Sequence, residues 1–188
     1  MSRRSAPACT CTRMTEEPVL EGRRVVLGLG NLLNRDEGLG VHALRALEER
    51  LGATPGGGPS AAGVELVDGG VLGLNLLPLI EACSHLLVLD AVDAGRPPGS
   101  VVELAREKIP LLRGVKLSEH QVTFQEVLGL ASFRGRLPET LCIVGAQPAD
   151  LEIGLELSPV VAAKIPSIVD RAAEILAGWR SPVGTEVG

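Results

Sequence analysis

The feature that most constrains the fold is a glycine-rich turn at residues 28–40, which comes directly after an apolar segment. Four glycines and the adjacent carboxylates of Asp36 and Glu37 lie within it, and a helical pattern follows. An apolar strand, a glycine turn and a helix in this order are typical of an α/β unit on a parallel sheet. Such sheets carry their functional sites at the carboxyl ends of the strands, so the turn predicts acidic oxygens at that edge.

The rest of the chain alternates between short apolar runs and amphipathic segments. The apolar runs predict strands at residues 24–29, 64–67, 85–90, 100–104 and 141–146. Apolar positions that recur about every three to four residues predict helices at residues 38–51, 72–82, 122–130 and 159–179. This order implies right-handed crossovers, and therefore a single α/β domain with a twisted, mainly parallel sheet of about five strands and helices on both faces.

Several residues are expected to act at the boundaries of these elements. Asp36 is expected to cap the first helix, since negative charge is favourable near a helix amino end. Ser158 is a good N-cap for the last helix. Pro78 and Pro166 are expected to kink or bend helices, because proline removes a backbone donor. Asp68, followed by two glycines, is expected either beside the site or in a turn, where its carboxylate accepts hydrogen bonds from backbone amides.

Length and composition limit the domain organisation and the partners. The 188 residues suffice for one core and predict a domain at residues 23–180, between a disordered extension (1–22) and a flexible tail (181–188). A net charge of -5 without basic stripes argues against nucleic acid. No apolar run approaches the roughly 20 residues that span a bilayer, and the first 22 residues lack the apolar core of an export signal. We expect a monomer in the cytoplasm, with neither a nucleic-acid nor a membrane partner and no disulfide framework.

Three residues from separate segments are candidates for a divalent-metal site. Glu37 follows the first strand, Asp90 ends the third, and His120 lies in a later loop, so they can meet at one edge of the sheet. Ionised carboxylate and neutral imidazole are good ligands for first-row transition metals, including nickel. Each residue also has a structural interpretation: Glu37 as a charge at a helix terminus, Asp90 as a capping or turn residue, and His120 as a solvated histidine. The residues alone leave both interpretations open.

Other site chemistries fit the sequence poorly. The glycines suggest a dinucleotide-binding turn, but Asp36 and Glu37 would repel a phosphate there. Neither a Gly-x-Ser-x-Gly nor a His-Glu-x-x-His pattern occurs, and no base is evident beside the two inner cysteines. Asp93 is expected in a turn, and His42 and His85 are expected to be structural histidines with satisfied hydrogen bonds.

Five blocks of the chain resemble the signature of the nickel-iron hydrogenase maturation endopeptidases. They arrive in the family's order, which is more specific than any one block. The resemblance covers about residues 25–179 and leaves out the amino-terminal extension. The blocks are Gly28–Val41, Asp68–Gly70, Leu89–Ala91, Ser118–Gln121 and Gly145–Pro148.

This resemblance implies an endopeptidase that removes the carboxyl-terminal extension of a hydrogenase large-subunit precursor after nickel insertion. The family's metal-contacting positions correspond to Glu37, Asp90 and His120, and the resemblance implies that the same residues are catalytic. The nickel is expected to arrive with the precursor, and a permanently bound catalytic metal is the competing version. Two rivals from other classes remain: a non-hydrolytic nickel chaperone or sensor, and a general metallopeptidase that cleaves short peptides.

Overall fold

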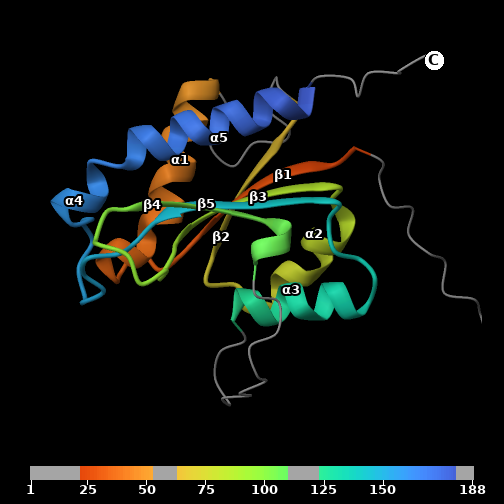
Figure 1. Cartoon of the computed structure of the whole chain (residues 1–188), viewed down its shortest axis with the longest axis horizontal. Helices are drawn as coiled ribbons and strands as arrows, with labels where there is room; N and C mark the ends of the chain where they lie inside the picture. Colours follow the sequence, from red (N-terminus) through yellow and green to blue (C-terminus); the bar gives the residue numbers. More distant parts are fainter. Residues whose placement is uncertain (1–21, 53–62, 110–122, 181–188) are drawn as a thin grey trace, which may run out of the picture.

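The computed structural model describes residues 22–52, 63–109 and 123–180, in which a five-stranded sheet lies between layers of helices (Figure 1). The strands are β1 (Arg24–Leu29), β2 (Glu65–Gly70), β3 (His85–Ala91), β4 (Val101–Ala105) and β5 (Thr140–Ala146). The α-helices are α1 (Leu39–Leu51), α2 (Leu77–Ala82), α3 (Phe124–Phe133), α4 (Pro159–Ala162) and α5 (Ile165–Arg180). Short 3-10 turns are η1 (Arg35–Gly38), η2 (Gly73–Leu76) and η3 (Arg106–Lys108). The predicted fold class is confirmed.

The strand order explains why segments far apart in the chain meet at one edge. The order is β2-β1-β3-β5-β4, and each neighbouring pair is parallel except β4 with β5. Near its carboxyl end β1 pairs with both neighbours, since Gly28 lies opposite Asp68 of β2 and Leu89 of β3. The turns that follow these three strands therefore emerge side by side, which is where α/β proteins carry their sites.

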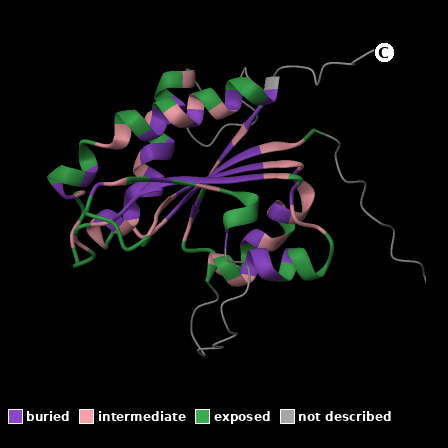
Figure 2. Ribbon diagram, viewed as in Figure 1, coloured by how far each residue is buried: buried purple, intermediate pink, exposed green. Residues whose placement is uncertain are grey.

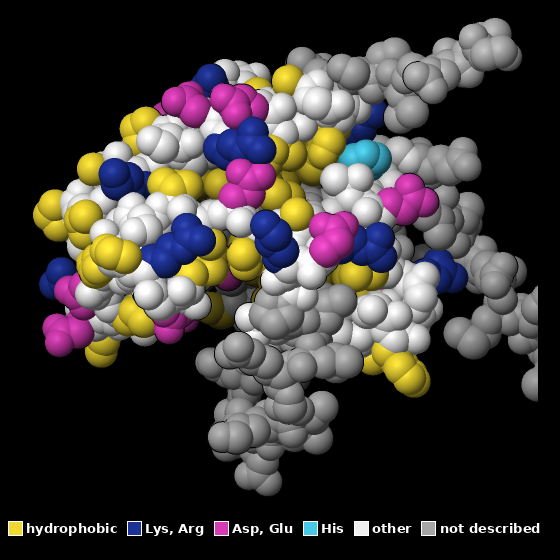
Figure 3. All heavy atoms as spheres, in the orientation of Figure 1, with side chains coloured by type: hydrophobic (Ala, Val, Ile, Leu, Met, Phe, Trp, Pro, Cys, Tyr) yellow, Lys and Arg dark blue, Asp and Glu magenta, His cyan; other side chains and the backbone are white. Residues whose placement is uncertain are grey.

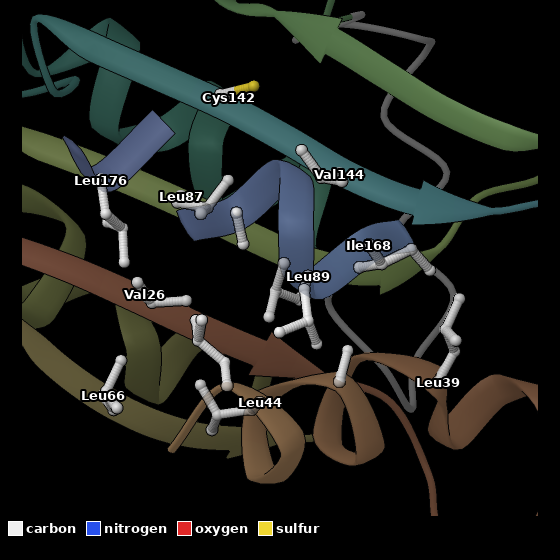
Figure 4. Close-up of a cluster of buried hydrophobic side chains, with 14 of the residues drawn as sticks. Val26, Leu39, Leu44, Leu66, Leu87, Leu89, Cys142, Val144, Ile168 and Leu176 are labelled. Atoms are coloured by element: carbon white, nitrogen blue, oxygen red, sulfur yellow. The ribbon is translucent and has the colours of Figure 1, made fainter. Parts of the chain in front are cut away.

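Two apolar clusters hold the helices to the sheet. Successive strand residues point to opposite faces, so Val26 faces α1 and α5 while Val25 and Leu27 face α2 and α3. Figure 4 shows the first cluster, in which Leu44 of α1 and Ile168 of α5 pack over the strands. The central strands β1, β3 and β5 are buried along most of their length, whereas the edge strands β2 and β4 and the outer faces of the helices are more exposed (Figure 2).

Glycine at position 40 permits close packing of α1 on the sheet. A Cβ atom at Gly40 would lie 2.0 Å from the carbonyl oxygen of Leu89 and 2.4 Å from that of Leu29. Any side chain would therefore push α1 away from β1 and β3. The glycine-rich turn thus has a packing role in addition to its carboxylates.

The structure corrects several predicted boundaries. Pro78 does not kink a long helix: it lies in the first turn of α2, where its missing N–H costs nothing, and η2 precedes it. The last helix is divided into α4 and α5, and the break comes before Pro166. The second strand continues through Asp68 to Gly70, although these residues were predicted to form a turn.

One helix start was predicted at residue 122 and lies at Phe124. Thr123 is its N-cap, and its hydroxyl accepts a hydrogen bond from the backbone N–H of Glu126 at 3.3 Å. The Glu126 carboxylate accepts from the backbone N–H of Thr123 at 2.6 Å, which completes a capping box. The Thr-x-x-Glu pattern that produces it is visible in the sequence.

Some of the predictions concern residues that the structure does not describe. The extension at residues 1–22, apart from Gly22, and the tail at 181–188 lie outside the described residues, as do Cys9 and Cys11. Cys83 and Cys142 are buried free thiols. Within the described residues, none of the helices has the length and apolar character needed to cross a membrane.

Candidate functional site

A cleft of about 480 Å³ opens at the carboxyl ends of β1, β2 and β3. Its wall from the glycine-rich turn includes Gly30 and Glu37, and its wall from β3 includes Asp90. The segment that follows β2 and the start of α3 supply an apolar rim. The rim residues are Val71, Leu72, Leu74, Leu76 and Phe124.

Gly30 gives the turn its shape. Its φ is +122°, in a region that favours glycine, and a Cβ there would lie 1.7 Å from the carbonyl oxygen of Glu37. Its backbone N–H donates to the carbonyl oxygen of Gly70 at 3.0 Å, which joins the turn after β1 to the end of β2. The backbone before Glu37 can therefore fold back tightly, and this brings Glu37 to the cleft.

Asp90 and Glu37 line the same cleft although 53 positions separate them in the chain. Asp90 is half-buried, and this burial raises the pKa of its carboxyl to about 7. A backbone hydrogen bond at Ala91 opposes the rise, and the negative charge of Glu37 adds to it. Among the described residues, neither carboxylate takes part in an ion pair. Within the described part of the chain, the cleft thus holds two acidic groups without a cation paired to either, an arrangement that favours binding of a cation.

The structure brings together two of the three predicted site residues and does not describe the third. His120 lies in the segment 110–122, outside the described residues. Within residues 22–52, 63–109 and 123–180, no three His, Cys, Asp or Glu side chains are grouped closely enough to hold a metal ion. The three-ligand metal site remains a prediction.

Asp36, next to Glu37, does not cap a helix. Its side chain is fully buried, and its carboxylate accepts hydrogen bonds from the backbone N–H groups of Ala149, Asp150 and Ser158 at 2.8, 2.9 and 2.7 Å. The Ser158 hydroxyl also donates to it, at 2.8 Å. Ser158 occupies the predicted N-cap position of α4, but its side chain makes no capping hydrogen bond with that helix. Burial by itself would raise the pKa of Asp36, but these four hydrogen bonds outweigh burial and lower the pKa. Asp36 therefore anchors the β5–α4 connection.

Two other carboxylates accept hydrogen bonds from nearby backbone N–H groups, Asp68 at the end of β2 and Asp93 in the predicted turn after β3. Asp68 is exposed, and its Oδ1 accepts from the backbone N–H of Gly70 at 3.0 Å. Asp93 accepts from the backbone N–H of Gly95 at 3.2 Å and from the Gln147 amide at 3.1 Å. The Gln147 side-chain oxygen accepts from the backbone of Ala94, so this side chain holds the turn after β3.

The histidines of the described residues differ from one another. His85 is structural. Its Nδ1 lies 2.8 Å from the Ser84 hydroxyl oxygen, and its ring packs edge-on against the Trp179 ring, with 5.2 Å between the ring centroids. The prediction of satisfied hydrogen bonds is wrong for His42, whose Nε2 is buried without a partner among the described residues. Burial, with a smaller contribution from Arg45, lowers the pKa of His42, so the ring stays neutral at neutral pH.

Sequence patterns did not reveal the apolar rim of the cleft or the anchoring role of Asp36. Leu72, Leu74 and Leu76 were assigned to a helix at residues 72–82 and Phe124 to one at 122–130, and the pattern did not show that a 3-10 turn precedes α2. Asp36 bonds backbone groups more than 110 residues away, and no local spacing encodes such a contact.

The fold and the cleft define a single-domain α/β protein with paired carboxylates at the carboxyl edge of its sheet. A sequence profile of the hydrogenase maturation proteases matches residues 41–175. Hydrogenase expression/formation protein HoxM of Cupriavidus necator is 40% identical over 157 residues, which cover 82% of this chain and 74% of the relative. The hydrogenase 2 maturation protease of Escherichia coli is 36% identical over 155 residues, which cover 82% of this chain and 90% of that protein.

Solved structures give the same result. The hydrogenase-maturating endopeptidase HybD from E. coli aligns with a TM-score of 0.69 at 33% identity, over 83% of this chain and 93% of that one. A hydrogenase 2 maturation peptidase from a Thaumarchaeota archaeon aligns with a TM-score of 0.59 at 28% identity, over 82% of this chain and 98% of that one. The chain belongs to the hydrogenase maturation protease family, and it is an endopeptidase of hydrogenase maturation.

Proposed function

We propose that this endopeptidase removes the carboxyl-terminal extension of a nickel-iron hydrogenase large-subunit precursor, and that it does so only after nickel has been inserted. The observation that carries the proposal is the cleft shared by Glu37 and Asp90, in which two carboxylates lack a cation partner among the described residues. Nickel held by the precursor is the cation that would complete this site. His120 is proposed as the third contact, because imidazole is a good nickel ligand.

The nickel belongs to the substrate in this proposal. Contact with Glu37 and Asp90 would place the scissile peptide next to the ion, which can polarise the carbonyl group toward attack by water. Water then adds to the carbonyl carbon, the C–N bond breaks, and the departing amine takes up a proton. A precursor without nickel would bring no cation to the two carboxylates that line the cleft, so the contact that positions the scissile peptide would be missing.

The requirement for nickel is tested by incubating the purified chain with precursor, with and without inserted nickel, and measuring the mass of the large subunit. Loss of the extension only from the nickel-loaded form supports the proposal. Equal cleavage of both forms contradicts nickel recognition and leaves the endopeptidase assignment intact.

The source of the metal needs a separate measurement. The chain is dialysed against a chelator, and its metal content is determined before and after addition of the nickel-loaded precursor. Metal-free protein that cleaves this precursor supports nickel supplied by the substrate. Retention of one metal ion per chain after dialysis supports the competing version, a permanently bound catalytic metal.

Substrate size distinguishes this function from a general metallopeptidase. A short peptide that spans the cleavage site, with added nickel, is expected to stay intact, because nickel and scissile bond are held together only in the folded precursor. Cleavage of the peptide at a rate close to that of the precursor contradicts the proposal.

A further inference from the structure

A group of exposed apolar side chains surrounds the β5–α4 connection. Leu151, Ile153 and Leu155 are 53%, 88% and 69% exposed, and Leu33 of the glycine-rich turn is 60% exposed. We refer to these four residues as the apolar ridge. Single exposed apolar residues are ordinary, but a group of them on one surface marks an interaction site.

Backbone hydrogen bonds bring the two parts of the ridge together. The backbone N–H of Gly154 donates to the carbonyl oxygen of Leu33 at 2.8 Å, and that of Arg35 donates to the carbonyl oxygen of Gly154 at 2.9 Å. These bonds form a parallel β-bridge between Asn34 and Gly154. Ile153 and Leu155, which flank Gly154, are therefore held beside the segment that carries Leu33.

The ridge has a firm support. The buried Asp36 carboxylate accepts four hydrogen bonds from the two ends of the β5–α4 connection, at residues 149–150 and 158. Arg35 forms an ion pair with Asp150 at 3.3 Å, and the backbone N–H of Asp36 donates to the Asp150 carbonyl oxygen at 3.1 Å. A preorganised surface loses little conformational freedom on binding, so its apolar area contributes more fully to affinity.

The ridge continues from the cleft through one short turn. Leu33 of the ridge lies four positions before Glu37 of the cleft. Asp36, which anchors the ridge, directly precedes Glu37. Hydrophobic side chains gather at the end of the molecule where α4 and the loop before it lie (Figures 1 and 3). A protein whose chain end enters the cleft would therefore meet the ridge with the surface next to that end.

Charge narrows the choice of partner. Exposed Glu152 and Glu156 alternate with the apolar residues of the ridge and give it an acidic border. A symmetric contact between two copies of this chain would bring these borders together, and like charges would oppose it. A partner with an apolar centre and a basic border would fit.

We propose that the apolar ridge docks the folded body of the large-subunit precursor, through an apolar face bordered by Lys and Arg. This inference rests on the proposed function, and it adds the surface by which the endopeptidase selects a whole protein instead of a peptide. Docking would place the chain end of the precursor at Glu37 and Asp90.

The test uses the double variant Ile153→Ser/Leu155→Ser and purified nickel-loaded precursor. Removing two exposed apolar anchors is expected to raise the KM for cleavage by about tenfold or more and to leave kcat within about twofold. Phe133→Ser is the matched control, because Phe133 is 90% exposed at the end of α3 opposite the cleft residue Phe124 and does not line the cleft, so the KM of this variant should not change. An unchanged KM in the double variant overturns the proposal.

A second pair of variants tests the acidic border. Glu152→Lys/Glu156→Lys is expected to weaken precursor binding, and the neutral Glu152→Gln/Glu156→Gln to weaken it less. The alternative partner is a second copy of this chain. Sedimentation of the wild-type chain without precursor, at the concentrations of the cleavage assay, tests whether it forms a dimer. A wild-type dimer that Ile153→Ser/Leu155→Ser dissociates would overturn the proposal in favour of a contact between two copies.

The docking claim and the proposed function fail separately. Affinity for the precursor is measured in the Asp90→Asn background, with and without the ridge substitutions, so docking has a readout that needs no cleavage. If the wild type fails to shorten the precursor but the ridge substitutions weaken binding, the proposed function fails and docking holds. If the wild type cleaves and the ridge substitutions change neither affinity nor KM, docking fails and the proposed function holds.

Discussion

The two sides of the glycine-rich turn use neighbouring carboxylates in opposite ways. On one side Asp36 is fully buried, accepts four hydrogen bonds and has a lowered pKa. On the other side the cleft holds Glu37 and Asp90, which have no ion-pair partner among the described residues, and burial raises the pKa of Asp90 to about 7. A satisfied carboxylate stabilises the fold, whereas an unsatisfied one costs stability and is retained for binding or chemistry.

The largest expected effect comes from the cleft side. Asp90→Asn keeps the shape of the side chain but removes its charge, and it should slow precursor cleavage by about three orders of magnitude, which corresponds to roughly 4 kcal/mol of transition-state stabilisation. The measurement is the rate at which the mass of the large subunit falls. A rate within about threefold of the wild type, less than 1 kcal/mol, would mean that Asp90 is not in the catalytic site.

The same variant should be more stable than the wild type at alkaline pH. A raised pKa means that the folded state holds a proton which the unfolded chain has already released, so the contribution of Asp90 to stability declines as pH rises from about 4 through about 7. Asn carries no such cost, and the gain at pH 8 should be about 1–3 kcal/mol. Urea unfolding of both proteins at pH 5 and pH 8 measures it, and a loss of stability at pH 8 would contradict the account.

Substitution of the buried Asp36 should mainly lower the free energy of unfolding. Asp36→Ala leaves the buried donors of Ala149, Asp150 and Ser158 without an acceptor, and we expect a loss of about 3–5 kcal/mol. Chemical unfolding above pH 5 measures the loss. The contribution of Asp36 is present above the unfolded pKa of about 3.8 and disappears as pH falls through its lower folded value. A variant as stable as the wild type at pH 7 would show that these hydrogen bonds contribute little.

The pH dependence of cleavage should come from ionisation of Asp90 in the cleft and not from Asp36. Nickel contact requires the ionised form of Asp90, whose pKa is about 7, so the rate should fall by up to about tenfold for each unit below pH 7. A positive ion delivered by the precursor favours the ionised form, and the midpoint should therefore move to lower pH as precursor concentration increases. A flat profile between pH 5 and pH 8 at low precursor concentration would remove Asp90 from the ionising groups of the site.

The smallest effect is expected at Asp68, a third carboxylate near the same edge. Its exposed carboxylate accepts a single hydrogen bond among the described residues, from the backbone N–H of Gly70 at the end of β2. Asp68→Ala should reduce stability by about 0.5–1 kcal/mol and change cleavage only a few-fold. A loss of cleavage as large as that of Asp90→Asn would place Asp68 in the site itself.

Local patterns predicted most of the fold because its elements are encoded locally. Continuous apolar runs identified all five strands, and the mainly parallel sheet was predicted from their alternation with helices. The antiparallel edge strand β4 is the part that alternation did not reveal, since β4 follows β3 without an intervening helix. The contact that holds Ser158, just before α4, to Asp36 is likewise long-range and was not visible in local patterns.

The sequence predicted those site residues that combine a suitable side chain with a position at the end of a strand. Glu37 and Asp90 each end a strand or its turn, so parallel pairing was enough to bring them together. The different role of Asp36 was not predictable, because two adjacent acids look alike until the connection at residues 147–158 is in place. His120 remains a prediction from chemistry and family resemblance.

The most direct test of the account separates these two adjacent acids by a single substitution. Glu37→Gln is assayed for cleavage of nickel-loaded precursor and for its midpoint of thermal unfolding, beside the wild type and Asp36→Asn. The account predicts that Glu37→Gln unfolds at the wild-type temperature and leaves the precursor uncut, whereas Asp36→Asn unfolds at a lower temperature. Cleavage by Glu37→Gln at the wild-type rate would contradict it.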